Sequence, residues 1–305
     1  MTVAASSRPA HPRRRVAIVV TDTYSVDDPD YDTPLLLDAL RERGLDARAV
    51  VWHRGDDLSG FDAAVIRSPW DYPERPDEFA AWLERAAAQT RVLNDPGVIR
   101  WNLDKRYLSD LQAAGIRVVP TEYCRTADEV AAAVAAHGSE SVVVKPAVSA
   151  GARDTGLFHA DDPRARALGE RIVAAGGVAM VQPEVAELSA GHEKALYAID
   201  GRFTHAIAKG ALLAHGGGLR GGVYIENPVP VSATDAERAF VDDVLRAVAE
   251  VTALAPPLYA RIDTVVSADH GLVLLEAELI EPALNLHVAP HVTDVVADAI
   301  ARAVA

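Results

Sequence analysis

Apolar and polar residues alternate along this chain in patterns that divide it into three parts. In the first part, residues 14–100, short apolar runs at 14–20 and 62–68 are separated by segments of helical periodicity such as 76–88. Strands that alternate with helices in this way are typical of a small doubly wound α/β lobe. We therefore predict an N-terminal α/β domain over residues 14–100.

The second part, residues 101–185, also mixes strands and helices. Thr126 and Glu129 have the spacing of a capping box and predict the start of a helix. A small, polar, glycine-containing loop at 149–156 follows an apolar run that carries Lys145 near its end. The other elements that predict this central sheet-bearing lobe are a helix at 103–115, strands at 116–120, 141–147 and 178–185, and a helix at 163–175.

In the third part, residues 186–305, adjacent strands are joined by short turns. The alternating runs at 192–200 and 202–209 meet at an Asp-Gly dipeptide, which predicts an antiparallel hairpin. Thr234 and Glu237 form a second capping box at the start of a long helix. We predict an α+β lobe, with two further strands at 258–266 and 271–279 and a last helix near the C-terminus.

The composition favours small-molecule partners. Half of the 305 residues are hydrophobic, so the chain can build its core without disulfides or metals. A net charge of -14 would repel phosphate backbones, which argues against a nucleic-acid partner. No apolar stretch approaches the roughly 18 residues of a membrane span, and the only cysteine, Cys124, cannot form an internal disulfide. We expect a cytoplasmic protein without a membrane partner. Whether it forms a homo-oligomer is left open by the sequence.

The most specific group of polar residues lies in the last two predicted strands. Arg261 and Asp263 alternate on one strand, and Glu276 and Glu278 alternate on the next. Carboxylates brought together in this way repel each other unless cations lie between them, and Mg²⁺ prefers oxygen ligands of this kind. The pattern indicates a metal site at Asp263, Glu276 and Glu278. A solvated polar face of an antiparallel sheet is the alternative.

Lysine is scarce, since only four of the thirty basic residues are Lys. Lys105, Lys145 and Lys209 lie at a helix start or near strand ends, where compact point charges could bind polyphosphate. Lys194 follows Glu193 within a strand, and we interpret it as structural. Taken singly, each of the other three lysines is better interpreted as a surface residue, but together with the acidic cluster and the scarcity of lysine they indicate a phosphate site.

These motifs follow one another in an order that resembles the ATP-grasp superfamily over residues 100–290. The matching segments are DK, VVVKP, the small-residue loop, VQPEV, GHE, HAIAK, RID and LLEAELIEP. The resemblance implies a three-lobed fold in which two sheet-bearing lobes clamp ATP behind the N-terminal α/β lobe. Many members carry Asn where Glu278 stands, and the loop at 149–156 is less rich in glycine than the usual phosphate lid.

The resemblance also implies roles for individual residues. Lys209 and Arg261 would neutralise the transferring phosphate, and Asp263, Glu276 and Glu278 would hold one or two Mg²⁺ ions, for which Mn²⁺ can substitute. The residues expected to contact ATP, including its adenine and ribose, are Lys105, Lys145, Ser149, Gly151, Gln182, Pro183, Glu184, Val185, Glu193 and Lys209.

Within the superfamily the chain is similar to the group that contains the O-ureido-serine cyclo-ligase of D-cycloserine biosynthesis. The segments IRSPWDYPERPDEFAAWL, VLNDPGVIRWNLDKRYLSDL and LLEAELIEPALNL carry this similarity. It implies that ATP activates an amino-acid-like substrate as an acyl phosphate and that an internal nitrogen closes a ring, releasing ADP and phosphate. A carboxylate-amine ligase for another amino acid or a peptide, and a nucleotide-binding protein without turnover, remain alternatives.

Residues outside the nucleotide motifs are candidates for substrate binding. The segment with Arg67, Ser68, Trp70 and Asp71 follows a predicted parallel strand, at the edge where α/β lobes bind ligands. Arg67 could hold a carboxylate. Alternatively, Trp70 and Tyr72 pack against the next lobe and Arg67 pairs with a local acid. Arg220, in a glycine-rich loop, could bind substrate and stabilise a phosphorylated intermediate, or lie at an exposed hairpin tip.

Overall fold

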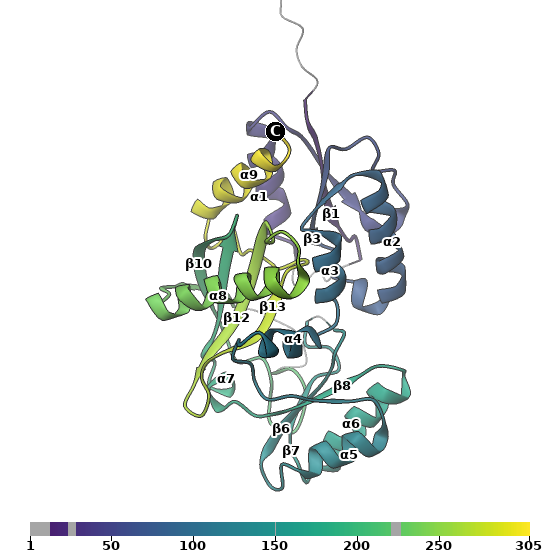
Figure 1. The fold of residues 1–305 in the computed structure, drawn as a ribbon, viewed down its shortest axis with the longest axis vertical. Coiled ribbons are helices and arrows are strands. Elements are labelled where there is room, and N and C mark those ends of the chain that lie inside the picture. Colours follow the sequence, from purple (N-terminus) through teal and green to yellow (C-terminus); the bar gives the residue numbers. More distant parts are fainter. Residues whose placement is uncertain (1–12, 24–28, 150, 221–226) are drawn as a thin grey trace, which may run out of the picture.

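The computed structural model describes residues 13–23, 29–149, 151–220 and 227–305. Its strands form three sheets, one in each predicted part of the chain. Figure 1 shows the N-terminal sheet at the upper right, the C-terminal sheet in the middle and the central-lobe sheet at the bottom. The prediction of three sheet-bearing lobes of mixed α/β and α+β class is confirmed, while the boundaries at 100 and 185 stay a prediction.

The N-terminal lobe is a parallel sheet in the order β2-β1-β3-β4. Val16 and Ile18 of β1 face helix α1, and the alternate residues Ala17 and Val19 face α2. Because side chains alternate along a strand, this apolar run buries both faces of the sheet. The elements are β1 (Arg15–Val20), α1 (Asp32–Glu42), β2 (Asp46–Val51), β3 (Ala63–Ser68), the 3-10 helices η1 (Trp52–Arg54) and η2 (Tyr72–Glu74), α2 (Pro76–Gln89) and β4 (Arg91–Leu93).

The central lobe is an antiparallel sheet in the order β5-β8-β6-β7. Helices α5 and α6 bury one face, where Val142 and Val144 of β6 join their apolar residues. The capping box is confirmed, because Thr126 and Glu129 bond each other's backbone N–H groups. The elements are β5 (Glu122–Cys124), α5 (Ala127–Ala135), β6 (Ser141–Pro146), β7 (Gly156–His159), α6 (Pro163–Ala174) and β8 (Ala179–Pro183).

The C-terminal lobe is an antiparallel sheet in the order β11-β10-β9-β12-β13. The predicted hairpin is confirmed, and it turns at Asp200 and Gly201, whose φ angles of 52° and 71° lie in the left-handed region. The second capping box, Thr234 with Glu237, is also present. The elements are α7 (Ala186–Ser189), β9 (Glu193–Ile199), β10 (Arg202–Lys209), β11 (Val229–Val231), α8 (Asp235–Thr252), β12 (Tyr259–Ser267), β13 (Gly271–Glu278) and α9 (His291–Ala303).

The two faces of the C-terminal sheet differ in character. Leu196, Ile262 and Ala277 lie in an apolar core under α8 and under α4 (Tyr107–Ala113), which follows α3 (Pro96–Asn102). On the opposite face, Tyr197 joins the core that α1 and α9 cover, while Arg261 lines an open pocket. The face under α8 and α4 is therefore mainly apolar, and the other divides into an apolar part and a polar part.

Helix α9 packs against α1, although the two lie at opposite ends of the described chain (Figure 1). Arg43, beside α1, forms ion pairs of 2.6 Å with Asp298 and 2.9 Å with Asp294. The N-terminal and C-terminal lobes thus share one apolar core.

Two element predictions are wrong in detail. Residues 116–120 form no strand, because this segment crosses between lobes and touches β13 through a single bridge from Val118 to Leu274. The helix predicted at 103–115 begins only at Tyr107, because the backbone N–H of Lys105 bonds Ala147 O at 2.8 Å and holds residues 103–106 in turns.

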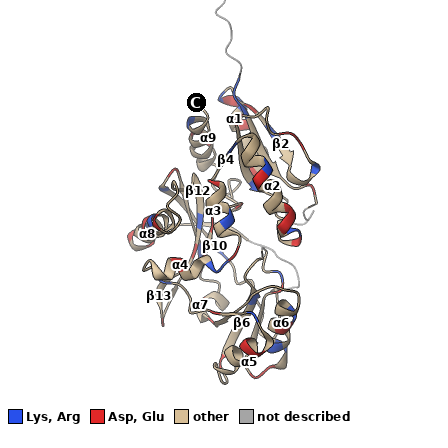
Figure 2. Ribbon diagram, turned by 45° about the vertical axis from the view of Figure 1, so that its right-hand side comes forward, with Lys and Arg blue, Asp and Glu red and all other residues tan. Residues whose placement is uncertain are grey.

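Acidic and basic residues occur together on the outer helices, as Figure 2 shows for α2 and α8. Among the residues that the structure describes, no helix has both the length and the apolar character that a membrane crossing requires.

Candidate active site

A pocket lies between the lobes, and residues of all three line it. Its charged lining groups are four cations and six carboxylates, and apolar side chains from the central and C-terminal lobes form much of the remaining wall. The charged residues are Lys105, Lys145, Lys209, Arg261, Glu184, Glu193, Asp263, Glu276, Glu278 and Glu281. A pocket with this composition can hold a polyphosphate next to an apolar ring.

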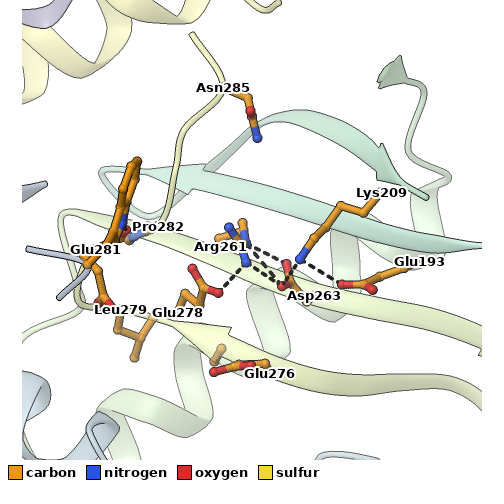
Figure 3. A network of polar contacts seen from close by, with 12 residues as sticks. Glu193, Lys209, Arg261, Asp263, Glu276, Glu278, Leu279, Glu281, Pro282 and Asn285 are labelled. Atoms are coloured by element: carbon orange, nitrogen blue, oxygen red, sulfur yellow. Dashed lines mark hydrogen bonds and ion pairs between the residues drawn. The ribbon is translucent and has the colours of Figure 1, made fainter. Parts of the chain in front are cut away.

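Strands β12 and β13 carry the most strongly charged wall. Their register places Arg261 opposite Glu278 and Asp263 opposite Glu276. Arg261 Nε donates to Asp263 Oδ1 at 2.9 Å, and its Nη2 pairs with Glu278. Lys209 Nζ, from β10, lies 3.0 Å from Asp263 Oδ2 (Figure 3). The predicted alternation therefore brings these residues onto one polar surface.

Burial and neighbouring charges shift the acids of this wall in opposite directions. Burial alone would raise the pKa of Asp263, but Arg261 and Lys209 outweigh it and hold that pKa below its ordinary value. Burial, together with the nearby carboxylates, raises the pKa of Glu278 to about 8 despite the opposing effect of Arg261. Asp263 is thus a stable carboxylate, whereas Glu278 gains most from an additional cation.

The lysines approach the wall from the central lobe. Lys105 Nζ lies 3.1 Å from Glu276 and 2.5 Å from the carbonyl oxygen of Ser149. Lys145 forms no ion pair with any residue in the described part of the chain, and burial lowers its pKa. Such a lysine is suited to an incoming phosphate.

Lys194 behaves differently, as expected from its place in β9. It lies on the other face of the sheet and pairs with Glu237 of α8 at 2.9 Å. Its neighbour Glu193 faces the pocket and lies 3.0 Å from Lys209. A one-residue step along the strand therefore separates a structural lysine from a pocket carboxylate.

The acidic residues fit a divalent ion by their donor chemistry. Asp263, Glu276 and Glu278 offer only carboxylate oxygens, the ligands that Mg²⁺ prefers, and all three line the pocket. Among described residues, no three metal-binding side chains form a ready-made cluster, because Arg261 and Lys105 pair with these acids. An ion bound there would replace Arg261 and Lys105 as the partner of these acids.

The opposite end of the pocket is suited to a planar ring. Gln182, Pro183, Glu184 and Val185 line it where β8 ends, beside apolar side chains. Gln182 Nε2 donates to Thr121 Oγ1 at 2.7 Å, which fixes the side chain. The apolar neighbours are Val119, Val143, Leu157, Leu188, Leu212, Leu213 and Leu275.

The loop at 149–156 borders the pocket, with Ser149 and Gly151 among its lining residues. Arg153 in this loop pairs with Glu74 of η2, so the loop connects the central lobe to the N-terminal lobe. Residue 150 lies outside the described residues.

The five residues predicted to bind substrate do not line the pocket. Ser68 donates to Asp30 at 2.5 Å, and Asp71 accepts from Trp52 at 2.7 Å, so both face the N-terminal lobe. Trp70 Nε1 donates to Glu281 O at 3.0 Å. These contacts favour the packing alternative for this segment.

The two candidate arginines also contact backbone. Arg67 is 2% exposed, and its Nη2 donates to Pro282 O. Arg220 donates to Leu213 O at 2.8 Å and to Ser189 O at 3.0 Å, so it connects two loops at the rim of the pocket. The geometry gives both arginines positioning roles.

Tyr72 and Glu281 are two of the pocket residues that were not among the sequence candidates. Tyr72 comes from η2 of the N-terminal lobe, and Glu281 from the loop after β13. The sequence did contain a signal for Glu281, since it lies within the LLEAELIEP segment that resembles the superfamily.

Known proteins resemble this chain in both sequence and structure. Residues 16–94 match the family described as D-cycloserine synthetase DcsG, N-terminal domain. The cycloserine biosynthesis protein DcsG of Streptomyces lavendulae is 36% identical over 283 residues, which cover 89% of this chain and 93% of that protein. A crystal structure of D-cycloserine synthetase DcsG superposes with a TM-score of 0.87 at 33% identity, covering 95% of this chain and all (100%) of that one.

More distant structures share the fold. An ATP-grasp RimK domain protein from Sphaerobacter thermophilus has a TM-score of 0.67 at 20% identity, with coverage of 94% of this chain and 99% of that one. D-alanyl-alanine synthetase A from Vibrio cholerae has a TM-score of 0.68 at 13% identity, with coverage of 96% and 98%. The chain has the ATP-grasp fold and belongs to the D-cycloserine synthetase family.

Proposed function

We propose that this ATP-grasp ligase activates the carboxylate of O-ureido-serine with ATP and closes the ring of cycloserine, forming a C–N bond. The observation that carries this proposal is the single pocket that combines three lysines and Arg261 with the acids of β12 and β13. Cations of this kind bind phosphate groups, and paired carboxylates suit the metal that accompanies them. Membership of the D-cycloserine synthetase family supports the choice of substrate.

In this proposal, different pocket residues bind different parts of the nucleotide. Lys105 and Lys145 bind the ATP phosphates, while the end of β8 at Gln182–Val185 holds the adenine and Glu193 accepts from the ribose. Asp263, Glu276 and Glu278 would hold Mg²⁺, or Mn²⁺ in its place, which supplies positive charge to the phosphates when bound.

The proposed reaction has two main steps, phosphoryl transfer and ring closure. A carboxylate oxygen of the substrate attacks the γ-phosphorus, the bond to the β–γ bridging oxygen breaks, and ADP leaves. Lys209 and Arg261 neutralise the charge that develops on the transferring group. The internal nitrogen then attacks the acyl carbon, loses its proton to a base and expels phosphate. Water hydrolyses the carbamoyl group that this nitrogen still carries, which leaves as carbon dioxide and ammonia, and the ring nitrogen of cycloserine keeps a proton. The loop at 149–156 protects the acyl phosphate from water.

The test is release of ADP and phosphate by purified protein with ATP and Mg²⁺, against O-ureido-serine enantiomers, other amino acids and dipeptides. We expect release with O-ureido-serine and a cyclic product by mass spectrometry, and strongly reduced release with Asp263→Asn. If only a different compound of the panel caused release, that compound would be identified as the substrate in place of O-ureido-serine. Tight ATP binding without release for any compound would contradict the proposed activity.

A further inference from the structure

Glu281 is a buried carboxylate that faces the pocket from the loop after β13. It is 8% exposed and lies three residues beyond Glu278. Its carboxylate faces the hydroxyl of Tyr72, whose proximity lowers the pKa of this carboxyl. Its backbone carbonyl accepts from Trp70 Nε1 at 3.0 Å, and Arg67 donates to the next carbonyl, that of Pro282. The N-terminal lobe thus fixes both the backbone and the carboxylate of Glu281.

The charge environment of Glu281 sets it apart from the other pocket acids. Glu193 and Asp263 pair with Lys209, Glu276 with Lys105 and Glu278 with Arg261, while Glu184 lies 3.2 Å from His215. No ion pair within the described residues reaches Glu281.

A buried carboxylate without a cationic partner is unfavourable in its ionised form. Burial, with a contribution from Glu276, raises the pKa of Glu281 to about 7, although Tyr72, Lys105 and Arg261 oppose the shift. The site therefore gains electrostatic stabilisation when a ligand brings a positive charge to this carboxylate.

An α-amino acid brings such a charge to a defined place. Its ammonium group is attached to the carbon next to the carboxylate, so the two groups lie within roughly 3 Å of each other, because only two single bonds separate the nitrogen from the carboxyl carbon. If Arg261 and Lys209 handle phosphate transfer to the carboxylate, the ammonium group lies close beside them. Glu281 follows β13 beyond Glu278, and Figure 3 shows it on the side of Arg261 away from Lys209.

The surroundings of Glu281 favour an ammonium group over a second metal ion. Tyr72, Leu103 and Ile280 also line this part of the pocket, and none of them supplies a carboxylate. The hydroxyl of Tyr72 can donate to only one acceptor position of this carboxylate and leaves others open. An ammonium group has three donors and needs only one carboxylate, whereas Mg²⁺ requires several oxygen ligands.

We propose that Glu281 binds the α-ammonium group of the amino-acid substrate and that Tyr72 positions its carboxylate. This inference rests on the proposed function and extends it, because it assigns the recognition of an amino acid to a residue outside the nucleotide and metal motifs. It also gives the N-terminal lobe a part in substrate recognition through Tyr72 of η2.

The experiment compares Glu281→Gln with wild type on two compounds, O-ureido-serine and its des-amino analogue, which has hydrogen in place of the amino group. Losing one charge-assisted hydrogen bond should raise the KM for O-ureido-serine by about 10-fold to 100-fold, with the KM for ATP unchanged. The des-amino analogue should be an equally poor substrate for both proteins. Calorimetry with a non-hydrolysable ATP analogue should show the same loss in the Kd for O-ureido-serine.

Two further variants make the result specific. Tyr72→Phe keeps the ring but removes the hydroxyl, and should raise the KM for O-ureido-serine by a smaller factor than Glu281→Gln does. This variant keeps the inference testable if Glu281→Gln fails to fold. Glu84→Gln, an exposed acid that pairs with Arg100, should match wild type throughout.

The outcomes separate this inference from the proposed function. If Glu281→Gln still prefers O-ureido-serine to its des-amino analogue by the wild-type factor, Glu281 does not bind the ammonium group. A rise in the Mg²⁺ requirement with unchanged substrate KM would identify a metal ligand instead. If wild type uses a different amino acid, that compound and its des-amino analogue replace the pair. Failure of wild type with every amino acid contradicts both proposals.

Discussion

Two buried polar clusters lie on the same face of the C-terminal sheet, and they are built differently. The pocket cluster consists of Arg261, Asp263, Lys209 and Glu278, whose charged side chains pair with one another. The junction cluster lies where the N-terminal lobe meets the sheet, and its polar side chains bond mostly to backbone. Its members are Asp32, Arg67, Tyr197, His205 and Asn285.

The junction cluster holds the loop after β13 in one conformation. Asp32 accepts from the backbone N–H groups of Leu284, Asn285 and Leu286 at 2.5, 3.2 and 2.7 Å. His205 Nε2 lies 2.9 Å from Leu284 O and its ring stacks on Tyr197. Backbone partners cannot leave without unfolding the loop, whereas paired side chains can exchange partners with a ligand. The junction cluster therefore serves stability, and the pocket cluster serves binding.

The largest expected effect comes from the pocket cluster. Asp263→Asn removes the carboxylate shared by Arg261 and Lys209, so we expect turnover to fall by about 10²-fold to 10³-fold. The melting temperature should change little, because the lost interactions face a cavity. Single-turnover kinetics and thermal unfolding measure the two effects. A large loss of stability with modest loss of turnover would place Asp263 with the junction cluster.

The next effect belongs to the junction cluster. Asp32→Ala leaves three backbone N–H groups without their acceptor and removes the acid 3.8 Å from buried Arg67. We expect the free energy of unfolding to drop by about 3 kcal/mol. Urea denaturation checks this, with Asp38→Ala, an exposed acid of the same helix, as the control. Equal stability of the two variants would refute the distinction between the clusters.

A pH effect of intermediate size should follow from His205. Burial lowers the pKa of His205 to about 4, below the 6.5 of an exposed histidine. The neutral ring therefore contributes stability above pH 6.5, and this contribution is lost as the pH falls from 6.5 to 4. We expect His205→Gln to weaken the pH dependence of unfolding in that window by about 2 kcal/mol. His192→Gln, a change at an exposed histidine, should leave the pH dependence of unfolding as in wild type. If His205→Gln also showed the wild-type pH dependence, the prediction would be wrong.

The smallest effect comes from a lysine that contacts neither cluster. Lys194→Met breaks the pair with Glu237, so stability should fall by about 1 kcal/mol while the KM for ATP stays unchanged. Lys209→Met, the matched change one strand away, should instead reduce turnover strongly. An altered KM for ATP in Lys194→Met would show that the two faces of the sheet are not independent.

The sequence predicted the parts of this molecule that depend on local pattern. Alternation along two adjacent strands was enough to place Arg261 and Asp263 with Glu276 and Glu278, and capping residues located the starts of α5 and α8. The crossing segment at 116–120 was misjudged because an apolar run does not reveal whether a partner strand is available.

Longer-range contacts could not be predicted in the same way. Arg67 was a candidate for substrate binding, yet it bonds the carbonyl of Pro282, 215 residues away. Tyr72 ends the segment considered for substrate binding but was not itself a candidate, because an aromatic residue there was expected to pack against the next lobe. Its place beside Glu281 depends on the tertiary fold. Tertiary partners of this kind have no signature in local periodicity.

The packing of α9 on α1 has a consequence for how the protein is made. Val292, Val296 and Ile300 complete the core around Leu36 and Leu40. A ribosome that has just finished the first lobe has not yet synthesised these residues, since Arg43 and its partner Asp294 are 251 positions apart. At a few residues per second, α1 leaves the exit tunnel well before its cover exists. The lobe over residues 14–100 therefore cannot complete its core until α9 has been synthesised, and the apolar face of α1 stays uncovered until then.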